Sequence, residues 1–181
     1  TDANGSYWLG TDQLGRDIYS RMIVGSTVSV LVGVVSVAIA GTIGVLVGLV
    51  AGFFGGWIDN VLMRLADGFL SIPFIILVVA ISGVLSPGLG TLMLILGLTG
   101  WVTYARVIRA EVLKAREMEY VVAAYAIGQR RIWVMLNHIL PNVVSTAIVL
   151  AASQVGVTIL AESSLSFLGL GLRPPVTSWG V

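Results

Sequence analysis

Residues 22–58 read MIVGSTVSVLVGVVSVAIAGTIGVLVGLVAGFFGGWI and contain no charged side chain. A helix of about 20 predominantly apolar residues is long enough to cross the hydrocarbon core of a bilayer. The stretch therefore holds one membrane span with its flanks, and we predict the span at residues 28–52. It places the chain among the all-α integral membrane proteins, with a polytopic helical bundle as the expected fold.

The composition of the whole chain supports this class. Of its 181 residues, 57% are hydrophobic and 10% are charged, and the mean hydropathy is +0.99. Soluble domains carry charge on about a quarter of their residues, and disordered chains are poor in apolar residues, so both classes are excluded. The net charge of +1 argues against nucleic acid as a partner. The chain begins with Thr1 rather than Met and ends at Val181 without a charged tail, which indicates a fragment of a longer polypeptide.

The remaining charge-free stretches predict three further spans. Residues 68–105 are too long for one helix, and the turn-forming sequence Ser86-Pro87-Gly88-Leu89-Gly90 interrupts them. We therefore predict a tight hairpin with spans at residues 69–85 and 91–110. A fourth span follows Pro141, covers residues 143–161 and ends before Glu162.

Four spans put both ends of the chain on one side of the membrane. Lys and Arg residues near span ends are retained in the cytoplasm. One side collects seven basic residues and the other side three: Arg64, Arg106, Arg109, Lys114, Arg116, Arg130 and Arg131 against Arg16, Arg21 and Arg173. This bias predicts a cytoplasmic loop at residues 111–141, an external segment at 1–24 before the first span, and a second external segment at 162–181.

Small residues recur at every fourth position of the first predicted span: Ser36, Ala40, Gly44, Gly48, Gly52 and Gly56. Such a stripe leaves a shallow groove on a helix, where the backbone of another helix approaches closely. We assign a helix-packing role to Ala40, Gly44, Gly48 and Gly52. The partner helix belongs either to the same subunit or to a neighbouring one, and the sequence leaves both open.

The predicted spans lack the residues that ion-driven transport or intramembrane catalysis needs. Their apolar cores contain no Asp, Glu, Lys, Arg or His, which disfavours a proton or sodium relay and an intramembrane protease. Without cysteine there is no thiolate nucleophile and no cysteine metal site. The only histidine, His138, is expected at the C-terminus of a helix. The single lysine, Lys114, does not lie in a phosphate-binding loop, so ATP binding by that route is excluded.

The polar residues of the spans are mostly small, with Gln154 as the largest. The set comprises Ser29, Ser36, Thr42, Ser82, Thr99, Thr103, Ser145, Thr146, Ser153, Gln154 and Thr158. These side chains either line a wet path for a solute or bond to backbone carbonyls one turn back. The substrate path therefore stays unassigned, and no metal-binding or catalytic residue is predicted.

The loop at residues 111–141 carries the strongest functional signal. Residues 119–128 predict a short helix with a face of small residues, and Gly128 suits the left-handed conformation that follows a helix end. Residues 129–139 predict a second short helix that Pro141 halts. Two short helices at an angle form a knob that fits a groove of another protein, so we expect a soluble partner.

The same loop resembles a known family motif. Val122-Ala123-Ala124 with Gly128, followed by His138-Ile139-Leu140-Pro141-Asn142, is similar to the EAA loop of ABC-importer permease subunits. This resemblance implies a coupling helix that docks onto an ATPase subunit. Val122 stands where the family pattern has a glutamate. The residues expected to form the docking loop are Glu119, Ala123, Ala124, Gly128, Gln129, Arg130, Leu140 and Pro141.

Three further stretches resemble the C-type permeases of dipeptide, oligopeptide and nickel importers. They are Leu9 to Arg21, Gly52 to Asp67, and Ser164 to Gly180, the last containing Ser164-Leu165-Ser166-Phe167-Leu168-Gly169. The resemblance covers nearly the whole chain and implies a truncated ABC transmembrane type-1 domain at residues 25–181. For the outer stretches, turns followed by an Asp helix cap are an alternative to contact with a substrate-delivering protein.

The resemblance implies a multi-pass protein of the prokaryotic inner membrane that forms half of an import pathway. It implies a sister permease, two cytoplasmic ATPase subunits that bind ATP and Mg²⁺, an extracytoplasmic solute-binding protein, and no catalysis on this chain. Peptides are the expected solutes. A secondary transporter or channel that works without ATP is the main alternative, and an intramembrane enzyme lacks candidate residues.

Overall fold

A computed structural model of the chain describes residues 7–12, 15–85, 88–171 and 178–180. In these residues the structure is helical and contains no strand beyond an isolated β-bridge between Thr11 and Asp17. Three helices are long and apolar enough to cross a membrane, or four if one sharply bent helix pair counts as a span. The predicted all-α membrane fold is thereby confirmed.

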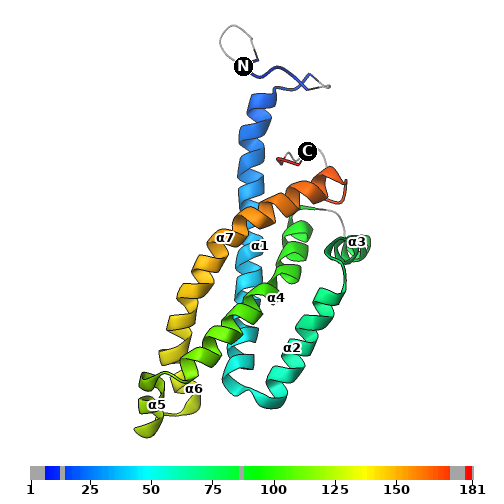
Figure 1. Ribbon diagram of the computed structural model, residues 1–181. Coiled ribbons are helices and arrows are strands. Elements are labelled where there is room, and N and C mark those ends of the chain that lie inside the picture. Colours follow the sequence, from blue (N-terminus) through cyan, green and yellow to red (C-terminus); the bar gives the residue numbers. More distant parts are fainter. Residues whose placement is uncertain (1–6, 13–14, 86–87, 172–177, 181) are drawn as a thin grey trace.

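Helix α1 (Ile18–Phe54) is the central element of the bundle (Figure 1). Its first turn is capped by Asp17, whose carboxylate accepts hydrogen bonds from the backbone of Tyr19 and Ser20. The hydroxyl of Ser20 also donates to this carboxylate at 2.5 Å, and it holds the pKa of Asp17 below its usual value. The cap lets α1 begin ten residues before the span predicted at 28–52.

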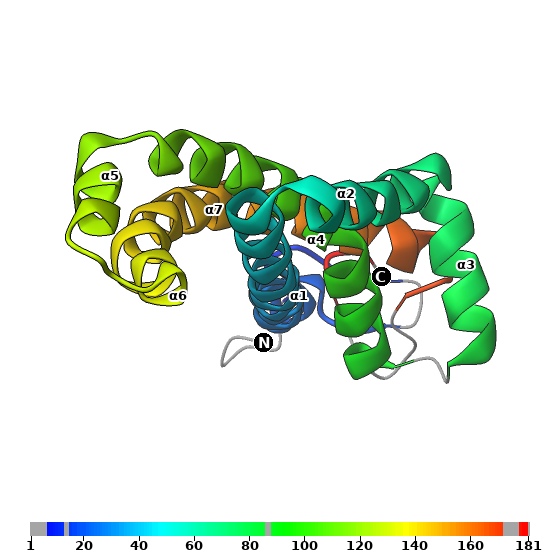
Figure 2. The ribbon, with the colours of Figure 1, turned by 90° about the horizontal axis from the view of Figure 1, so that it is seen from below.

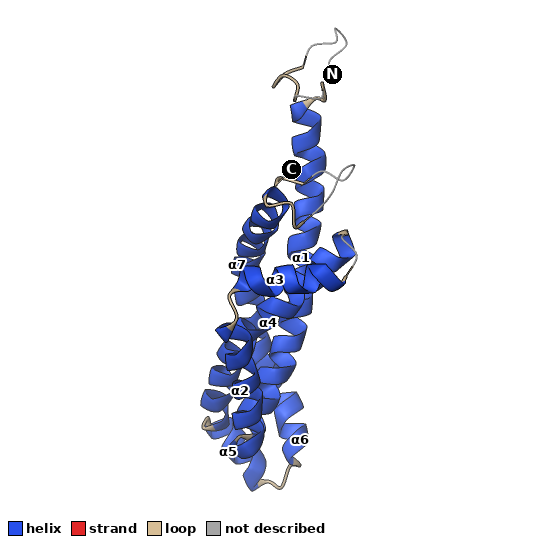
Figure 3. Ribbon diagram, turned by 90° about the vertical axis from the view of Figure 1, so that its right-hand side faces the viewer, coloured by secondary structure: helices blue, strands red, loops and turns tan. Residues whose placement is uncertain are grey.

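The prediction of one continuous helix at residues 69–85 is wrong. The chain forms α2 (Gly56–Ser71) and α3 (Phe74–Val84), which are bent by 90° relative to each other. Pro73 causes the break, because its ring forces the preceding residue out of the helical region: Ile72 has a ψ of 123°. Figure 3 shows α3 lying across the bundle rather than along it.

Helix α4 (Leu89–Arg116) runs beside α1 in the same direction. Gly44, Gly48 and Gly52 of α1 lie against Tyr104, Ile108 and Val112 of α4, respectively. Each step of four residues along α1 thus matches a step of four residues along α4. Viewed along the bundle, α2 and α3 lie on one side of α1, and α5 (Glu119–Ala126) and α6 (Arg131–Val134) lie on the other (Figure 2).

Pro141 does not halt a helix, which corrects the prediction for residues 129–139. After α6, the chain passes through the π-helical segment η1 (Met135–Ile139) into α7 (Leu140–Phe167) without a break. Proline lacks an N–H and clashes with the carbonyl four residues back, and the wider π-turn accommodates both effects. The Leu140 amide bonds to the Met135 carbonyl, five residues back. His138 therefore lies inside a helical run and not at a helix C-terminus.

Two apolar clusters hold the helices together at different heights. One cluster joins α1 and α4 to α5, α6 and the start of α7 through Phe53, Val112, Val121, Val134 and Val143. The other joins α1, α3, α4 and the end of α7 through residues that include Val32, Val78, Ile95 and Leu165. Figure 3 shows α5 and α6 at one end of the molecule. Residues 7–12 and 178–180 lie toward the opposite end (Figure 1).

Candidate functional site

The candidate site is the knob, which we define as residues 119–139. It begins where α4 ends: the amides of Glu117 and Met118 bond to the carbonyls of Lys114 and Ala115 and close the last turn. Met118 is extended, with φ −71° and ψ 142°, and turns the chain into α5. Glu119 opens α5, where a negative charge is favoured by the helix dipole.

Gly128 ends α5 with the backbone geometry that the sequence predicts. Its φ is +80°, a left-handed conformation that side chains with a Cβ rarely adopt. The Gly128 amide bonds to the Tyr125 carbonyl and the Gln129 amide bonds to the Ala124 carbonyl, which together form a Schellman motif. Apart from Gly128 and its two chain neighbours, no atom of the described residues lies within 4 Å of a Cβ built on Gly128. Backbone conformation, and not space, therefore requires glycine at this position.

The inner face of the knob belongs to the core of the bundle. Val121 and Val134 are fully buried, and they share one apolar cluster with Ile108 and Val112 of α4. Ala124 is 4% exposed and belongs to the same cluster. The expectation that a partner meets Ala124 directly does not fit this burial, because the chain itself covers that side chain. Ala124 supports the knob from within.

The outer face of the knob is apolar and exposed. Val122, Ile127, Ile132 and Trp133 are each more than half exposed, with Ile127 at 76%. Arg130 and Arg131 are also exposed and follow the Gly128 turn. An exposed apolar patch bordered by charged residues is typical of a protein interaction surface.

Polar contacts join the two halves of the knob to the start of α7. The ring Nε2 of His138 lies 2.9 Å from the side-chain oxygen of Gln129. The Asn142 amide donates to the Tyr120 hydroxyl at 2.8 Å and to the His138 carbonyl at 2.9 Å. Of the predicted docking residues, Glu119, Ala123, Gly128, Arg130 and Pro141 are exposed, whereas Gln129 and Leu140 are half-buried.

The glycine stripe packs against α4 of the same chain. A Cβ added to Gly44 or Gly48 would lie 2.5 Å from the Trp101 or Ala105 carbonyl oxygen, and one on Gly52 would lie 2.9 Å from that of Arg109. Ala40 lies opposite Gly100 at the next contact of this seam. Residues with larger side chains would separate the two backbones. The stripe therefore packs against a helix of the same chain, which is one of the two alternatives that the sequence left open.

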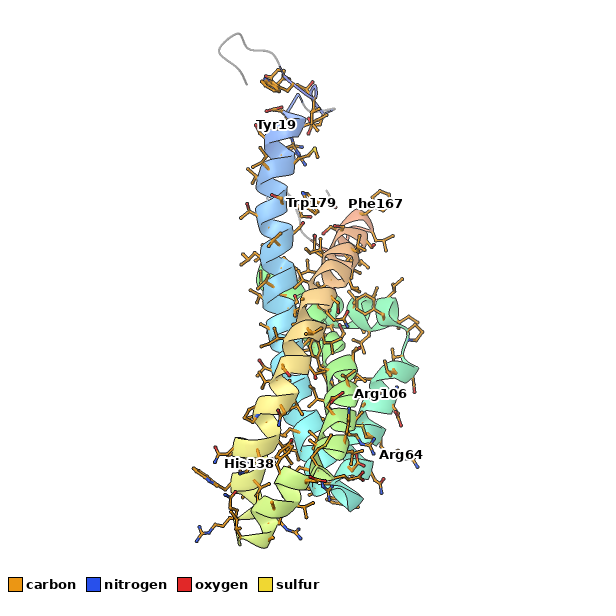
Figure 4. The ribbon with its side chains drawn as sticks, turned by 60° about the vertical axis from the view of Figure 1, so that its left-hand side comes forward. Tyr19, Arg64, Arg106, His138, Phe167 and Trp179 are labelled. Carbon is orange, nitrogen blue, oxygen red and sulfur yellow. The ribbon has the colours of Figure 1, made fainter. Side chains whose placement is uncertain are left out.

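Ion pairs join α2 to α4 near the knob. Asp59 accepts two hydrogen bonds from Arg109, at 2.5 and 2.6 Å, in a bidentate pair that is mostly buried on the aspartate side. Asp67 pairs with Arg106 at 2.7 Å in an exposed position. Figure 4 shows Arg64, Arg106 and His138 toward the knob end, and Tyr19, Phe167 and Trp179 toward the other. The basic residues that predict a cytoplasmic side thus gather at the end that carries the knob.

Comparison with known proteins places this architecture in a family. Residues 44–181 match the model of the "binding-protein-dependent transport system inner membrane component". The chain belongs to this family. The match covers the part of the small-residue stripe from Gly44 onward, the knob and all of α7.

Three relatives illustrate the family. The chain is 40% identical over 178 residues to the dipeptide transport system permease protein DppC of Bacillus subtilis (strain 168). It is 38% identical over 174 residues to the oligopeptide transport system permease protein OppC of the same organism. It is 34% identical over 177 residues to the glutathione transport system permease protein GsiD of Pectobacterium atrosepticum. These alignments cover 96–98% of this chain but only 56–59% of the relatives.

Two of the predictions are confirmed by these matches. The predicted resemblance to ABC-importer permeases of the peptide group agrees with the family and with the names of the relatives. The family is one of inner membrane components, as predicted for a multi-pass protein of a prokaryotic membrane. The chain spans somewhat more than half the length of these relatives.

One feature of this family member was missed by sequence reasoning. Helix α7 extends to Phe167, past the end predicted at residue 161, and Glu162 is completely buried within it. Its carboxylate accepts hydrogen bonds from the hydroxyls of Ser29 at 3.0 Å, Ser166 at 2.7 Å and Ser178 at 2.8 Å. We call Glu162 with these three serines the serine clasp. The only local signal is Ser166, one helical turn after Glu162.

The serine clasp seats the segment 178–180 between α1 and α7. The Trp179 amide donates to the Ser29 hydroxyl at 3.2 Å, and its indole N–H donates to the Met22 carbonyl at 3.2 Å. A Cβ on Gly25 would lie 3.1 Å from the Ser178 backbone, so the segment rests closely on α1. Residues of α1, α7 and the segment 178–180 therefore meet at one buried carboxylate.

Proposed function

We propose that this chain is part of a permease subunit that forms half of the translocation pathway of an ATP-driven importer. The names of the relatives support a di- or oligopeptide, or a related small molecule such as glutathione, as the solute. Since the chain spans somewhat more than half of those relatives, the proposal concerns the full-length protein.

The construction of the knob carries the proposal. Its inner face shares an apolar cluster with α1 and α4, so a force applied to the knob reaches the long helices without crossing a flexible joint. Its outer face offers exposed apolar side chains beside Arg130 and Arg131. A surface of this kind suits a partner that drives helix movement, and we propose a cytoplasmic ATPase subunit.

In this proposal the partner holds the nucleotide. The ATPase subunit binds and hydrolyses ATP with Mg²⁺, and this chain holds neither. The docking contacts come from Glu119, Ala123, Gly128, Gln129, Arg130, Leu140 and Pro141, with Ala124 as internal support. A sister permease completes the pathway, a second ATPase subunit docks on it, and an extracytoplasmic binding protein meets the end that carries Trp179 and Phe167, both exposed.

Affinity purification of the full-length protein, expressed with its partner subunits, tests this function. We expect the ATPase subunit to co-purify with the wild type and to be lost from the Ala123→Lys and Ile127→Asp variants. Both positions are exposed, so these changes alter the outer face without opening the core. The matched control is Glu117→Lys, an exposed position just before the knob, which should retain the ATPase.

Two results would contradict the proposal. Equal ATPase recovery from the wild type and both knob variants would remove the docking role. A wild-type protein that takes up solute without an associated ATPase would favour the alternative of a secondary transporter or channel.

A further inference from the structure

Polar side chains inside the long helices fall into two groups. Some bond to the backbone of their own helix: Thr42 to the Ala38 carbonyl at 2.7 Å, and Ser153 to the Leu150 carbonyl at 2.8 Å. These hydroxyls are satisfied locally and have no need of a ligand. Others form no such bond, and several of them lie around one cavity.

This cavity lies where α1, α3, α4 and α7 meet. Its volume is about 150 Å³, and we call it the polar cavity. Polar side chains in its lining are Ser36, Thr99, Tyr104, Gln154 and Thr158. Its apolar walls include Phe74, Leu96 and Val157, and the described residues that surround it include none with a charge.

Two buried hydroxyls border the polar cavity without a hydrogen bond. Ser36 and Tyr104 are each 1% exposed, and their hydroxyl oxygens find no partner among the residues that the structure describes. A buried polar group left unpaired is unfavourable, and such groups in native proteins commonly bond to water or to a ligand. A polar molecule bound in this cavity would supply the hydrogen bonds that these two hydroxyls lack.

Gln154 and Thr158 add hydrogen-bonding groups on the α7 side. They lie one helical turn apart, and both line the polar cavity. Both are half-buried, and neither side chain forms a hydrogen bond within the described part of the chain. The amide of Gln154 supplies two donors and an acceptor, and the Thr158 hydroxyl supplies one donor and an acceptor. Together these groups match both the N–H and the C=O of a peptide unit.

We propose that the polar cavity is a solute subsite that binds one uncharged peptide unit. The inference rests on the proposed import of peptides. A volume of about 150 Å³ is below the roughly 300–1,000 Å³ of pockets that enclose a drug-sized ligand, so the cavity takes one residue of a peptide and not the whole chain. Without a charged residue in its lining, it does not hold the peptide termini by ion pairs. Hydrogen bonds to the main chain are independent of sequence, and the subsite therefore accepts varied peptides.

Uptake of trialanine by the full-length complex, reconstituted in proteoliposomes with its ATPase and binding protein, tests the subsite. We expect Gln154→Leu and Thr158→Val each to raise the KM for uptake by about three- to tenfold, which corresponds to the loss of one hydrogen bond. The matched control, Ser153→Ala, removes a hydroxyl that bonds to its own helix, and it should leave the KM unchanged.

Thiol labelling gives a second measurement, because this chain has no cysteine of its own. In an otherwise cysteine-free complex, the Thr158→Cys variant should react with N-ethylmaleimide, and trialanine above its KM should slow that reaction at least threefold. The Ser153→Cys variant, at an exposed position outside the cavity lining, should react at the same rate with and without trialanine.

The outcomes separate the subsite from the proposed function. If the wild-type complex, supplied with ATP, takes up neither trialanine nor dialanine nor glutathione, the proposed import function itself fails. If the wild type transports trialanine but the Gln154 and Thr158 variants keep its KM, or if trialanine does not protect the Thr158→Cys variant, the subsite is overturned. In that case the polar cavity holds only water.

Discussion

The knob and the serine clasp lie at opposite ends of the same helices and are held by different forces. The knob is fastened by apolar contacts of Val121, Val134 and Ile139 with α1 and α4. The clasp depends on hydrogen bonds to one buried carboxylate, Glu162. Apolar contacts have no preferred direction, so they tolerate small shifts of one helix against another. Hydrogen bonds to a buried carboxylate are directional, and a shift that breaks them leaves buried donors unpaired. The knob end is therefore suited to passing on movement, and the clasp end to holding one arrangement.

The largest effect is expected from a change that pushes α1 and α4 apart, because both ends of the molecule rest on these two helices. Gly48→Leu would drive a side chain into the α4 backbone, since even a Cβ would lie 2.5 Å from the Ala105 carbonyl oxygen. We expect a loss of more than about 3 kcal/mol in the free energy of unfolding, because neither backbone can yield without breaking helix hydrogen bonds. Thermal unfolding of the detergent-solubilised protein measures this. Gly68→Ala is the control: apart from its own helix backbone and neighbours, nothing in the described structure lies within 4 Å of the new Cβ, and the variant should be at least as stable as the wild type.

The next effect should be confined to the clasp end. Glu162→Ala removes the acceptor of three buried hydroxyls, and we expect about 2–3 kcal/mol of destabilisation. Hydrogen exchange should accelerate at the Trp179 amide, which bonds to Ser29, while amides of the knob keep their protection. The Ser164→Ala variant removes a hydroxyl that bonds only to its own helix and serves as the control. Faster exchange in the knob as well would show that the two ends are not independent.

A smaller effect is expected at the knob end. Gly128→Val places a β-branched residue at φ +80°, which costs about 1–2 kcal/mol. We expect faster hydrogen exchange at the Gln129 amide, whose bond to the Ala124 carbonyl closes the Schellman motif, with no change at Trp179. Gly128→Asn should be milder, because asparagine tolerates the left-handed region. Equal effects of valine and asparagine would contradict a role that rests on backbone conformation.

The smallest effect concerns the ion pairs that join α2 to α4. Arg106→Ala breaks an exposed pair with Asp67, and we expect less than about 1 kcal/mol. Arg109→Ala should cost more, because Asp59 is only 14% exposed and loses two hydrogen bonds. Chemical denaturation of the two variants side by side measures the difference. A larger effect of Arg106→Ala would reverse this order.

The two interrupting prolines show how far local sequence determines a helix. Pro73 bends the chain by 90°, whereas Pro141 is absorbed by the π-turn of η1 within one continuous helical run. The same lack of an N–H operates at both sites. Around Pro141, Ile139 and Val143 are buried against α1 and α4, and this packing keeps the helix on its course. Sequence reasoning, which sees only the proline, predicted the reverse at both positions.

The sequence by itself determined the membrane class, the approximate helical stretches, the left-handed turn at Gly128 and the family. The first three follow from composition or from neighbours within a few residues, where apolar runs, glycine and charge act locally, and the family follows from motifs that resemble those of known permeases. Only the tertiary structure decided that Ala124 faces inward, that Glu162 meets Ser29, and that Ser36, Tyr104, Gln154 and Thr158 surround one cavity. Ser29 and Glu162 are 133 residues apart. Such contacts depend on the register and rotation of one helix against another. The close α1–α4 packing and the π-turn before α7 set both of these, and no local sequence pattern encodes them.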